Sequence, residues 1–317
     1  MTVTIINADC RHALRELPDA SVHCCVTSPP YWGLRDYGVG GQIGLEMSAQ
    51  TFVDNMVDVF REVRRVLRKD GTLWLNLGDS YAGGGNYRGL SSENTLTSKQ
   101  RSNRGATGVS QQLGAVGKES QAKDKELVGI PWRVALALRN DGWYLRQDII
   151  WHKPNPMPES VTDRCTKSHE YIFLLSKSPR YHFDAAAIAE ASVYADSGRA
   201  SARPEDLSPN RKCTDPGGNL SFRAITEKRN KRSVWTVPTA VFSEAHFATF
   251  PPDLIEPCIL AGCPEGGTVL DPFGGAGTTG LVADRLQRHA TLIELNTEYA
   301  DLARKRIDSD APLLAVG

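Results

Sequence analysis

Residues 268–280 read TVLDPFGGAGTTG, and this stretch is the most informative about the fold. The apolar run from Thr268 to Leu270 predicts a short strand, the glycines predict a tight turn, and Leu281 to Leu286 predicts a following helix. Glycine lets the backbone turn sharply and a ligand approach, and a helix N-terminus offers free N–H groups to an anionic group. A strand, a glycine turn and a helix in this order predict a site for a nucleoside cofactor.

The spacing of the glycines narrows the choice of cofactor. Gly275, Gly277 and Gly280 fit the pattern G-x-G-x-x-G, and Glu294 follows about 20 residues on, at the end of a second predicted strand, 289–293. A carboxylate in that place can accept hydrogen bonds from two ribose hydroxyls. NAD, FAD and S-adenosylmethionine sites share this pattern, and a purely structural turn is a further alternative.

Two features favour S-adenosylmethionine. A dinucleotide fingerprint normally opens its domain, whereas this one follows about five predicted strands. Asp271 stands where dinucleotide sites usually carry a small apolar residue, and its carboxylate can receive a cationic amino group such as the methionine part of S-adenosylmethionine provides. A nicotinamide-dependent oxidoreductase is the rival interpretation.

The rest of the chain alternates strand and helix patterns. Short apolar runs predict strands at 3–8, 22–26, 72–77 and 143–151, and helical spacing predicts a helix from Thr51 to Arg68 that Lys69-Asp70-Gly71 ends. Such alternation predicts an α/β fold with a mostly parallel sheet covered on both faces. Two segments, residues 79–126 and 190–235, do not follow this alternation of strands and helices. Both are locally basic, which predicts functional loops or a small recognition subdomain, with a solvated surface as the alternative.

Composition sets the class of protein. Of 317 residues, 40% are hydrophobic and 23% charged, which is typical of a globular chain. Lys plus Arg and Asp plus Glu are both 37, so any nucleic-acid contact must be local. The seven cysteines show no CxxC pair or zinc-type histidine spacing, which predicts reduced, mostly buried thiols and no metal site. With no signal peptide and no apolar run of about 18 residues, we expect a cytoplasmic protein without a membrane partner.

A second motif, Thr27-Ser28-Pro29-Pro30-Tyr31-Trp32, follows the predicted strand 22–26, where open α/β sheets bind ligands. The prolines stiffen the loop and remove two donors, which leaves the Ser28 hydroxyl and the Pro29 carbonyl as acceptors and Tyr31 as a stacking surface. Two acceptors can hold the exocyclic amine of a base so that its lone pair attacks a sulfonium methyl directly. The base must first leave the duplex. A turn used only for packing is the alternative.

Together, TSPPYW followed by DPFGGAGTTG and IELN resemble the amino-methyltransferase family of DNA methyltransferases, in its permuted β group. GTLWLNLGDS, WHKPNPMPESVTDRCTKSHEYIFLLSKSPRYHFD and HFATFP resemble further family motifs, in the family's order. The resemblance implies a Rossmann-like S-adenosylmethionine-dependent methyltransferase fold with a mostly parallel seven-stranded sheet, circularly permuted, plus a small irregular target-recognition region. The implied domains are a catalytic half at 1–184 with a basic Gly/Ser-rich loop at 79–126, a target-recognition region at 185–238, and a cofactor-binding half at 239–317.

The resemblance also implies roles for individual residues. The residues that bind and orient the target amine and base are Ser28, Pro29, Pro30 and Tyr31. Those that line the cofactor are Asp9, Phe250, Asp271, Phe273, Gly275, Gly277, Thr278 and Glu294. Asp9 is expected at the adenine, Glu294 at the ribose and the others on the methionine side. The basic residues expected to bind DNA are Arg223, Lys228, Arg229, Lys231 and Arg232. His152, His169 and Asp79 are interpreted as structural, with a catalytic role as the alternative.

Within the family, a tetrapeptide beginning with Ser is typical of N4-cytosine enzymes and one beginning with Asp of N6-adenine enzymes, so Ser28 favours cytosine. N6-adenine remains the alternative, because a hydroxyl and a carboxylate can both accept from an amine. C5-cytosine chemistry needs a nucleophilic cysteine, and Cys258 has helix-like surroundings instead. The expected partners are double-stranded DNA, a cognate restriction endonuclease and a second copy in a homodimer. A non-catalytic DNA-binding module is the remaining rival.

Overall fold

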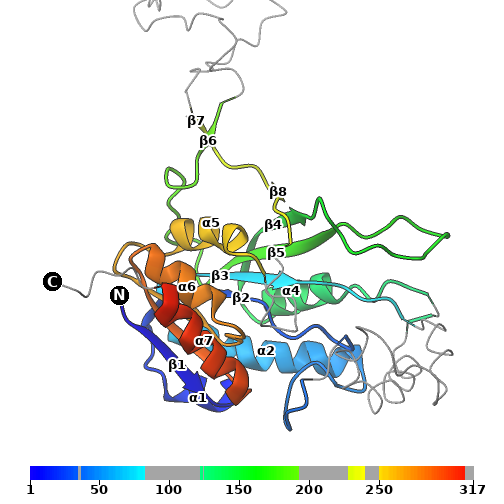
Figure 1. Cartoon of the computed structure of the whole chain (residues 1–317), viewed down its shortest axis with the longest axis horizontal. Coiled ribbons are helices and arrows are strands. Elements are labelled where there is room, and N and C mark those ends of the chain that lie inside the picture. Colours follow the sequence, from blue (N-terminus) through cyan, green and yellow to red (C-terminus); the bar gives the residue numbers. More distant parts are fainter. Residues whose placement is uncertain (35–36, 83–121, 124, 193–227, 240–249, 311–317) are drawn as a thin grey trace, which may run out of the picture.

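The computed structural model describes residues 1–34, 37–82, 122–123, 125–192, 228–239 and 250–310. Its centre is an eight-stranded sheet with helices on both faces (Figure 1). In spatial order its strands are β1 (Val3–Asn7), β10 (His289–Glu294), β9 (Thr268–Asp271), β2 (Val22–Thr27), β3 (Leu67–Leu77), β5 (His169–Ser176), β4 (Tyr144–His152) and β8 (Val234–Thr236). The helices are α1 (Cys10–Glu16), α2 (Ala49–Val66), α4 (Ile130–Asn140), α5 (Pro252–Gly262), α6 (Thr278–Arg285) and α7 (Thr297–Asp310).

The sheet is mostly parallel, as predicted, but it has eight strands where the family resemblance implies seven. Only β5 runs against its neighbours, β3 and β4. The extra strand is β8, whose Val234 pairs in parallel with Ile150 of β4. Three residues carry too little alternation to reveal a strand in the sequence, so pairing with β4 is what defines it. Residues 185–238 therefore end in the main sheet.

Alternating side chains of the central strands supply two cores, one on each face of the sheet. In β2, Cys25 joins the core covered by α1, α2 and α4, and Cys24 joins the core covered by α5, α6 and α7. Leu73 and Trp74 of β3 divide in the same way. The cysteines of the described residues are free thiols, and all but Cys165 are buried, as predicted.

Helix α2 ends earlier than the sequence predicts. Ser48 caps its N-terminus by accepting from the backbone N–H of Thr51, but the helix stops at Val66 and β3 begins at once. The residues Lys69-Asp70-Gly71, expected to end the helix, lie within β3. Tertiary contacts explain the difference, because Lys177 donates to the Leu67 carbonyl over 2.6 Å and Ala20 donates to that of Arg65.

One edge of the sheet collects the ends of strands from both halves of the chain. The carboxyl ends of β2, β3, β9 and β10 meet there, and the register pairs Leu77 at the end of β3 with Tyr171 near the start of β5.

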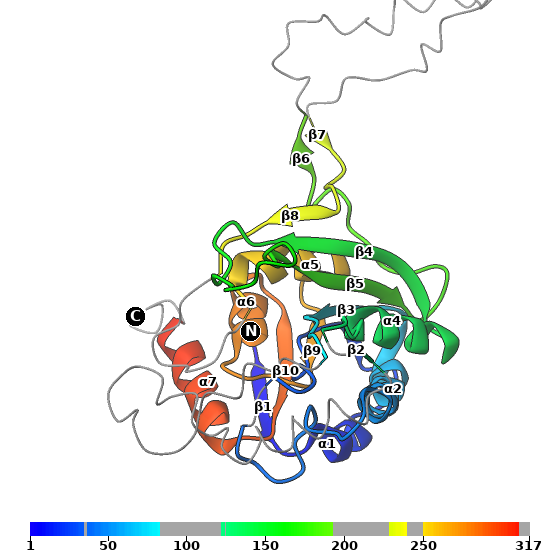
Figure 2. The ribbon, with the colours of Figure 1, turned by 90° about the vertical axis from the view of Figure 1, so that its right-hand side faces the viewer.

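The two-stranded ribbon of β6 (Glu190–Ala191) and β7 (Lys228–Arg229) stands away from the main sheet (Figure 2). None of the helices in the described ranges is long and apolar enough to cross a membrane.

Candidate active site

The glycine turn joins β9 to α6 as predicted, and its glycines serve different purposes. A Cβ on Gly277 would lie 2.8 Å from the Cβ of Ala303, and one on Gly280 would lie 2.8 Å from Leu292 Cδ1, so both allow close packing. A Cβ on Gly275 would meet nothing nearer than the Phe273 carbonyl at 3.9 Å. Gly275, at φ +50°, is therefore the glycine that leaves room for a ligand.

Glu294 closes onto this turn from the end of β10. Its carboxylate accepts from the backbone N–H of Gly275 over 2.7 Å and from that of Asn296 over 2.8 Å. Burial raises the pKa of Glu294 above its ordinary value. A carboxylate has about four acceptor positions, so acceptor capacity stays available for other donors. The room at Gly275 and this spare acceptor capacity fit the ribose of a nucleoside cofactor.

Asp271 lies at the end of β9 with its side chain almost fully enclosed, at 1% exposure. One carboxylate oxygen accepts from the Thr27 hydroxyl over 2.6 Å and the Phe273 N–H over 3.0 Å, and the other from the Thr279 hydroxyl over 2.6 Å. Burial raises its pKa. The observed role is to join the ends of β2 and β9 to the start of α6, and the expected contact with an amino group stays a prediction.

The other expected cofactor residues surround the same edge. Asp9 caps α1 and pairs with the Arg11 guanidinium, which lowers the pKa of the carboxyl. Phe250 and Phe273 are half-buried against opposite cores. The buried Thr278 hydroxyl accepts from Arg306 over 2.9 Å. Asp9 already has a cationic partner, so its contact with an adenine remains a prediction.

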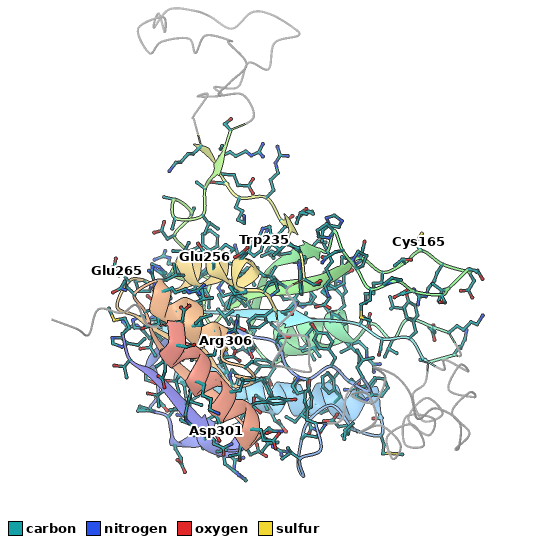
Figure 3. All side chains as sticks on the ribbon, viewed as in Figure 1. Cys165, Trp235, Glu256, Glu265, Asp301 and Arg306 are labelled. Atoms are coloured by element: carbon teal, nitrogen blue, oxygen red, sulfur yellow. The ribbon has the colours of Figure 1, made fainter. Side chains whose placement is uncertain are left out.

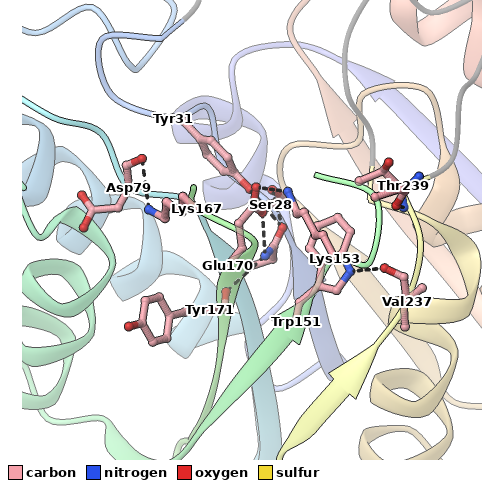
Figure 4. A network of polar contacts seen from close by, with 12 residues as sticks. Ser28, Tyr31, Asp79, Trp151, Lys153, Lys167, Glu170, Tyr171, Val237 and Thr239 are labelled. Atoms are coloured by element: carbon pink, nitrogen blue, oxygen red, sulfur yellow. Dashed lines mark hydrogen bonds and ion pairs between the residues drawn. The ribbon is translucent and has the colours of Figure 1, made fainter. Parts of the chain in front are cut away.

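The target loop at the end of β2 belongs to a polar network that sequence reasoning did not resolve (Figure 4). The hydroxyls of Ser28 and Tyr31 each lie 3.2 Å from Oδ1 of Asn76 in β3. The Tyr31 hydroxyl also donates to Glu170 of β5 over 2.6 Å. Asn76 is fixed by donating to the Tyr171 carbonyl over 3.1 Å. Strands β3 and β5 therefore hold the loop from one side, through the acceptor oxygens of Asn76 and Glu170.

Glu170 is held in turn by Lys153. The two side chains form an ion pair and are only 14% and 17% exposed. Lys153 Nζ also lies 4.2 Å from the centroid of the Trp151 ring. Desolvation, followed by the neighbouring Glu170 charge, raises the pKa of Tyr31 well above its ordinary value, which keeps the phenol protonated as a donor. Asn76, Lys153 and Glu170 lie within the motif stretches quoted above, but their meeting depends on the antiparallel β5.

The Tyr31 ring packs on the end of β3. A Cβ added to Gly78 would lie 2.4 Å from Tyr31 Cε2, so only glycine allows this approach. The expected stacking residue is thus held by a glycine beneath its ring and by Glu170 at its hydroxyl.

The three residues interpreted as structural have structural partners. Asp79 accepts from the N–H groups of Gly129 and Ile130, both over 3.0 Å, at the start of α4. His152 Nδ1 lies 3.1 Å from the Thr236 hydroxyl, which joins β4 to β8. His169 meets the Tyr171 ring edge to face, and burial lowers its pKa.

The basic residues expected at DNA lie on or beside the β6–β7 ribbon. Arg229 and Lys231 pair with Glu190 at 3.4 Å and 3.6 Å. Lys231 Nζ also lies 5.2 Å from the Trp235 ring centroid. Lys228 belongs to β7, Arg232 lies between β7 and β8, and Arg223 lies outside the described residues. DNA contact by these residues remains a prediction.

A glycine turn open to a nucleoside cofactor, next to a polar loop at the carboxyl edge of a mostly parallel sheet, defines an S-adenosylmethionine-dependent methyltransferase fold. The model of the N6/N4 methyltransferase family, described as DNA methylase, matches residues 22–305, and the chain belongs to this family. The family excludes the oxidoreductase interpretation.

Two relatives and one solved structure illustrate the similarity. The type II methyltransferase M.SmaI of Serratia marcescens is 46% identical over 303 residues, covering 96% of this chain and 90% of the relative. M.Cfr9I of Citrobacter freundii, also a type II methyltransferase, is 44% identical over 308 residues, covering 97% and 88%. The fold resembles that of PvuII DNA methyltransferase (cytosine-N4-specific), with TM-score 0.63, 17% identity and coverage of 98% and 91%.

Proposed function

We propose that this DNA methylase transfers a methyl group from S-adenosylmethionine to the exocyclic N4 amino group of cytosine in double-stranded DNA. The observation that carries the proposal is the Ser28 hydroxyl, whose proton is directed at Asn76 Oδ1 over 3.2 Å. A hydroxyl that donates to Asn76 keeps its lone pairs for an incoming amine. The site is therefore suited to accept from an NH₂ group.

The reaction is a direct transfer in which the N–C bond forms as the S–C bond breaks. When bound, S-adenosylmethionine supplies an electrophilic methyl on a sulfonium centre. Ser28 and the Pro29 carbonyl would each accept one hydrogen of the amine, which favours a pyramidal nitrogen with a free lone pair. The methylated amine is strongly acidic and loses one proton to water. No covalent bond between protein and base is required.

Each half of the site has its own part in this reaction. Tyr31 would stack on the extruded base, with its ring fixed by Gly78 and Glu170. Glu294 would accept from the ribose hydroxyls, and the open face of Gly275 would leave room for the cofactor. The hydrogen bond between Thr27 and Asp271 joins the two halves. Glu170 and Lys153 act through Tyr31 and are positioning residues.

Cytosine is favoured over adenine on two grounds. Ser28 opens the Ser-Pro-Pro-Tyr motif, and the PvuII enzyme of similar fold is described as cytosine-N4-specific. The alternative, N6 of adenine, would use the same acceptors. We expect a cytoplasmic location, and the type II names of its relatives support a cognate restriction endonuclease as a functional partner. A homodimer remains a prediction.

The decisive experiment identifies the product. Purified protein is incubated with unmodified genomic DNA and S-adenosylmethionine, the DNA is digested, and the nucleosides are analysed by mass spectrometry. We expect N4-methylcytosine. N6-methyladenine would refute the choice of base while keeping the pocket, and absence of any methylated nucleoside would refute the proposed activity on DNA.

A further inference from the structure

A long connection between β4 and β5 extends beyond the active-site edge of the sheet. It runs through residues 153–168, and its base is closed by the pairing of His152 with His169 and by the Lys153 N–H donating to the Ser168 carbonyl over 2.8 Å. Cys165, labelled in Figure 3, lies on this loop well beyond the strand ends. The loop therefore leaves the sheet on the side where Ser28 and Tyr31 lie.

The loop is held in place at several points. Arg164 lies over the Tyr81 ring at 3.9 Å from its centroid, and Lys125 pairs with Asp163 at 2.9 Å. On the other arm, the Asn155 side chain accepts from the backbone N–H of Thr239 over 3.0 Å. These contacts anchor both arms of the loop.

The same loop is joined to the target pocket at its two ends. Lys153, its first residue, pairs with Glu170, which accepts from the Tyr31 hydroxyl. Near its other end, Lys167 donates to the Asp79 carbonyl over 3.3 Å, just after β3 (Figure 4). A nucleobase that stacks on Tyr31 would therefore lie next to the first and last residues of this loop.

Met157, two residues after the anchored Asn155, carries an unusual amount of exposed apolar surface. Its side chain is 86% exposed, against 59% for Val234, the next most exposed large hydrophobic side chain of the described residues. Single exposed apolar residues are common, so exposure alone decides nothing. Here the flanking Pro156 and Pro158 stiffen the backbone on both sides. A rigid support keeps the exposed side chain from folding back onto the protein.

We infer that Met157 is an apolar wedge that enters the DNA stack next to the target base. Removing a base from a duplex costs a few kcal/mol of lost stacking and pairing and leaves a gap. Proteins that deform DNA insert Met, Leu, Ile, Phe or Pro between base steps. A methionine on an anchored loop beside the target pocket matches that requirement. The inference rests on the proposed function, because it needs an extruded base.

The test compares two DNA substrates after the methylated site has been mapped in genomic DNA treated with the wild-type protein. One synthetic duplex carries that site fully paired, and the other carries an abasic position opposite the target base. We expect Met157→Ala to lower the single-turnover methylation rate about tenfold on the paired duplex, because a wedge lowers the cost of extrusion. On the second duplex the base is already unpaired, so the rate should lie within about twofold of wild type.

Control variants separate a wedge from a structural effect. Met157→Leu keeps an apolar side chain of similar size and should restore the rate. Leu136→Ala, which shortens a 38% exposed apolar side chain on α4, should leave both rates unchanged. An equal loss for Met157→Ala on both duplexes, or no loss on the paired one, would overturn the wedge. Wild-type protein that methylates neither genomic DNA nor duplex would instead overturn the proposed function.

Discussion

The hydroxyl of Thr27 donates to the carboxylate of Asp271 over 2.6 Å, although 244 residues separate them in the chain. Thr27 ends the strand that leads into the target loop, and Asp271 ends the strand that leads into the glycine turn. Both side chains are buried, at 0% and 1% exposure. This hydrogen bond therefore joins the two halves of the active site at the ends of β2 and β9, whose backbones also pair at Cys24–Val269 and Cys25–Leu270.

Replacing Thr27 by Val should destabilise the protein. The substitution keeps the shape of the side chain but leaves a buried carboxylate short of one donor, which costs about 1–3 kcal/mol. Urea unfolding followed by circular dichroism measures the change. Thr4→Val, at an exposed position of β1, should change the free energy of unfolding by less than about 0.5 kcal/mol. Equal effects of the two substitutions would contradict this view of Thr27.

The buried Asp271 makes stability depend on pH. Burial raises the pKa of its carboxyl above the ordinary value of 3.8. Between these two values the folded protein holds a proton that the unfolded chain has lost, so the contribution of Asp271 to stability falls as pH rises through that interval. Asp271→Asn removes the titrating group. The unfolding free energy of the wild type minus that of the variant should therefore decrease from pH 3.8 upward, and parallel pH profiles would rule this out.

Gly275→Ala and Gly277→Ala should fail in different ways. A methyl on Gly275 meets no atom nearer than 3.9 Å, so Gly275→Ala should cost only about 1 kcal/mol of stability, from backbone strain. Its main effect should be a lower affinity for the cofactor. A methyl on Gly277 lies 2.8 Å from Ala303 Cβ, so Gly277→Ala should also lose about 1–3 kcal/mol of stability to overpacking. Melting temperature and calorimetric titration with S-adenosylmethionine separate the two losses. Greater instability of Gly275→Ala would reverse the assignment.

Glu294→Gln should weaken binding of S-adenosylmethionine. The carboxylate accepts from two backbone N–H groups and has acceptor positions left for the ribose, whereas an amide has only one acceptor oxygen. Loss of a hydrogen bond to a charged group should lower the affinity for S-adenosylmethionine by about tenfold or more. Isothermal titration calorimetry measures it. The matched control is Glu298→Gln on the exposed first turn of α7, which should bind as the wild type does.

Tyr31→Phe and Glu170→Gln should lower the methylation rate by the same mechanism. Phe keeps the stacking ring and removes only the hydroxyl that donates to Glu170, whereas Gln removes the charge that holds this hydroxyl. Residues that act through one hydrogen bond show non-additive effects. We expect each single variant to lose about tenfold in single-turnover rate and the double variant to lose little more. Fully additive losses would mean that Glu170 acts independently of Tyr31.

Local sequence patterns predicted the parts of the site that need only neighbouring residues. The turn between Asp271 and Thr278, the loop after β2 and the carboxylate of Glu294 all lie where the sequence places them, because strand ends and glycine turns are local features. The buried pair Cys24 and Cys25 also followed from a short apolar run.

The meeting of Asn76, Lys153 and Glu170 could not be predicted in the same way. Nothing near Glu170 in the sequence indicates that β5 runs antiparallel beside β3, and that orientation is what brings its carboxylate to Tyr31. The early end of α2 and the pairing of β8 likewise depend on contacts with distant residues, Lys177 and Ile150.

Residue type and local spacing were enough to indicate the family, the cofactor class and the order of the two motifs, because they set the chemistry of each loop. Which side chains act on those loops depends on the tertiary structure. Thr27 and Asp271 become partners because the neighbouring strands β2 and β9 come from distant parts of the chain, and Tyr31 and Glu170 because β2 and β5 both flank β3. Strand order and direction arise when the whole sheet buries its two faces, and no local pattern contains them.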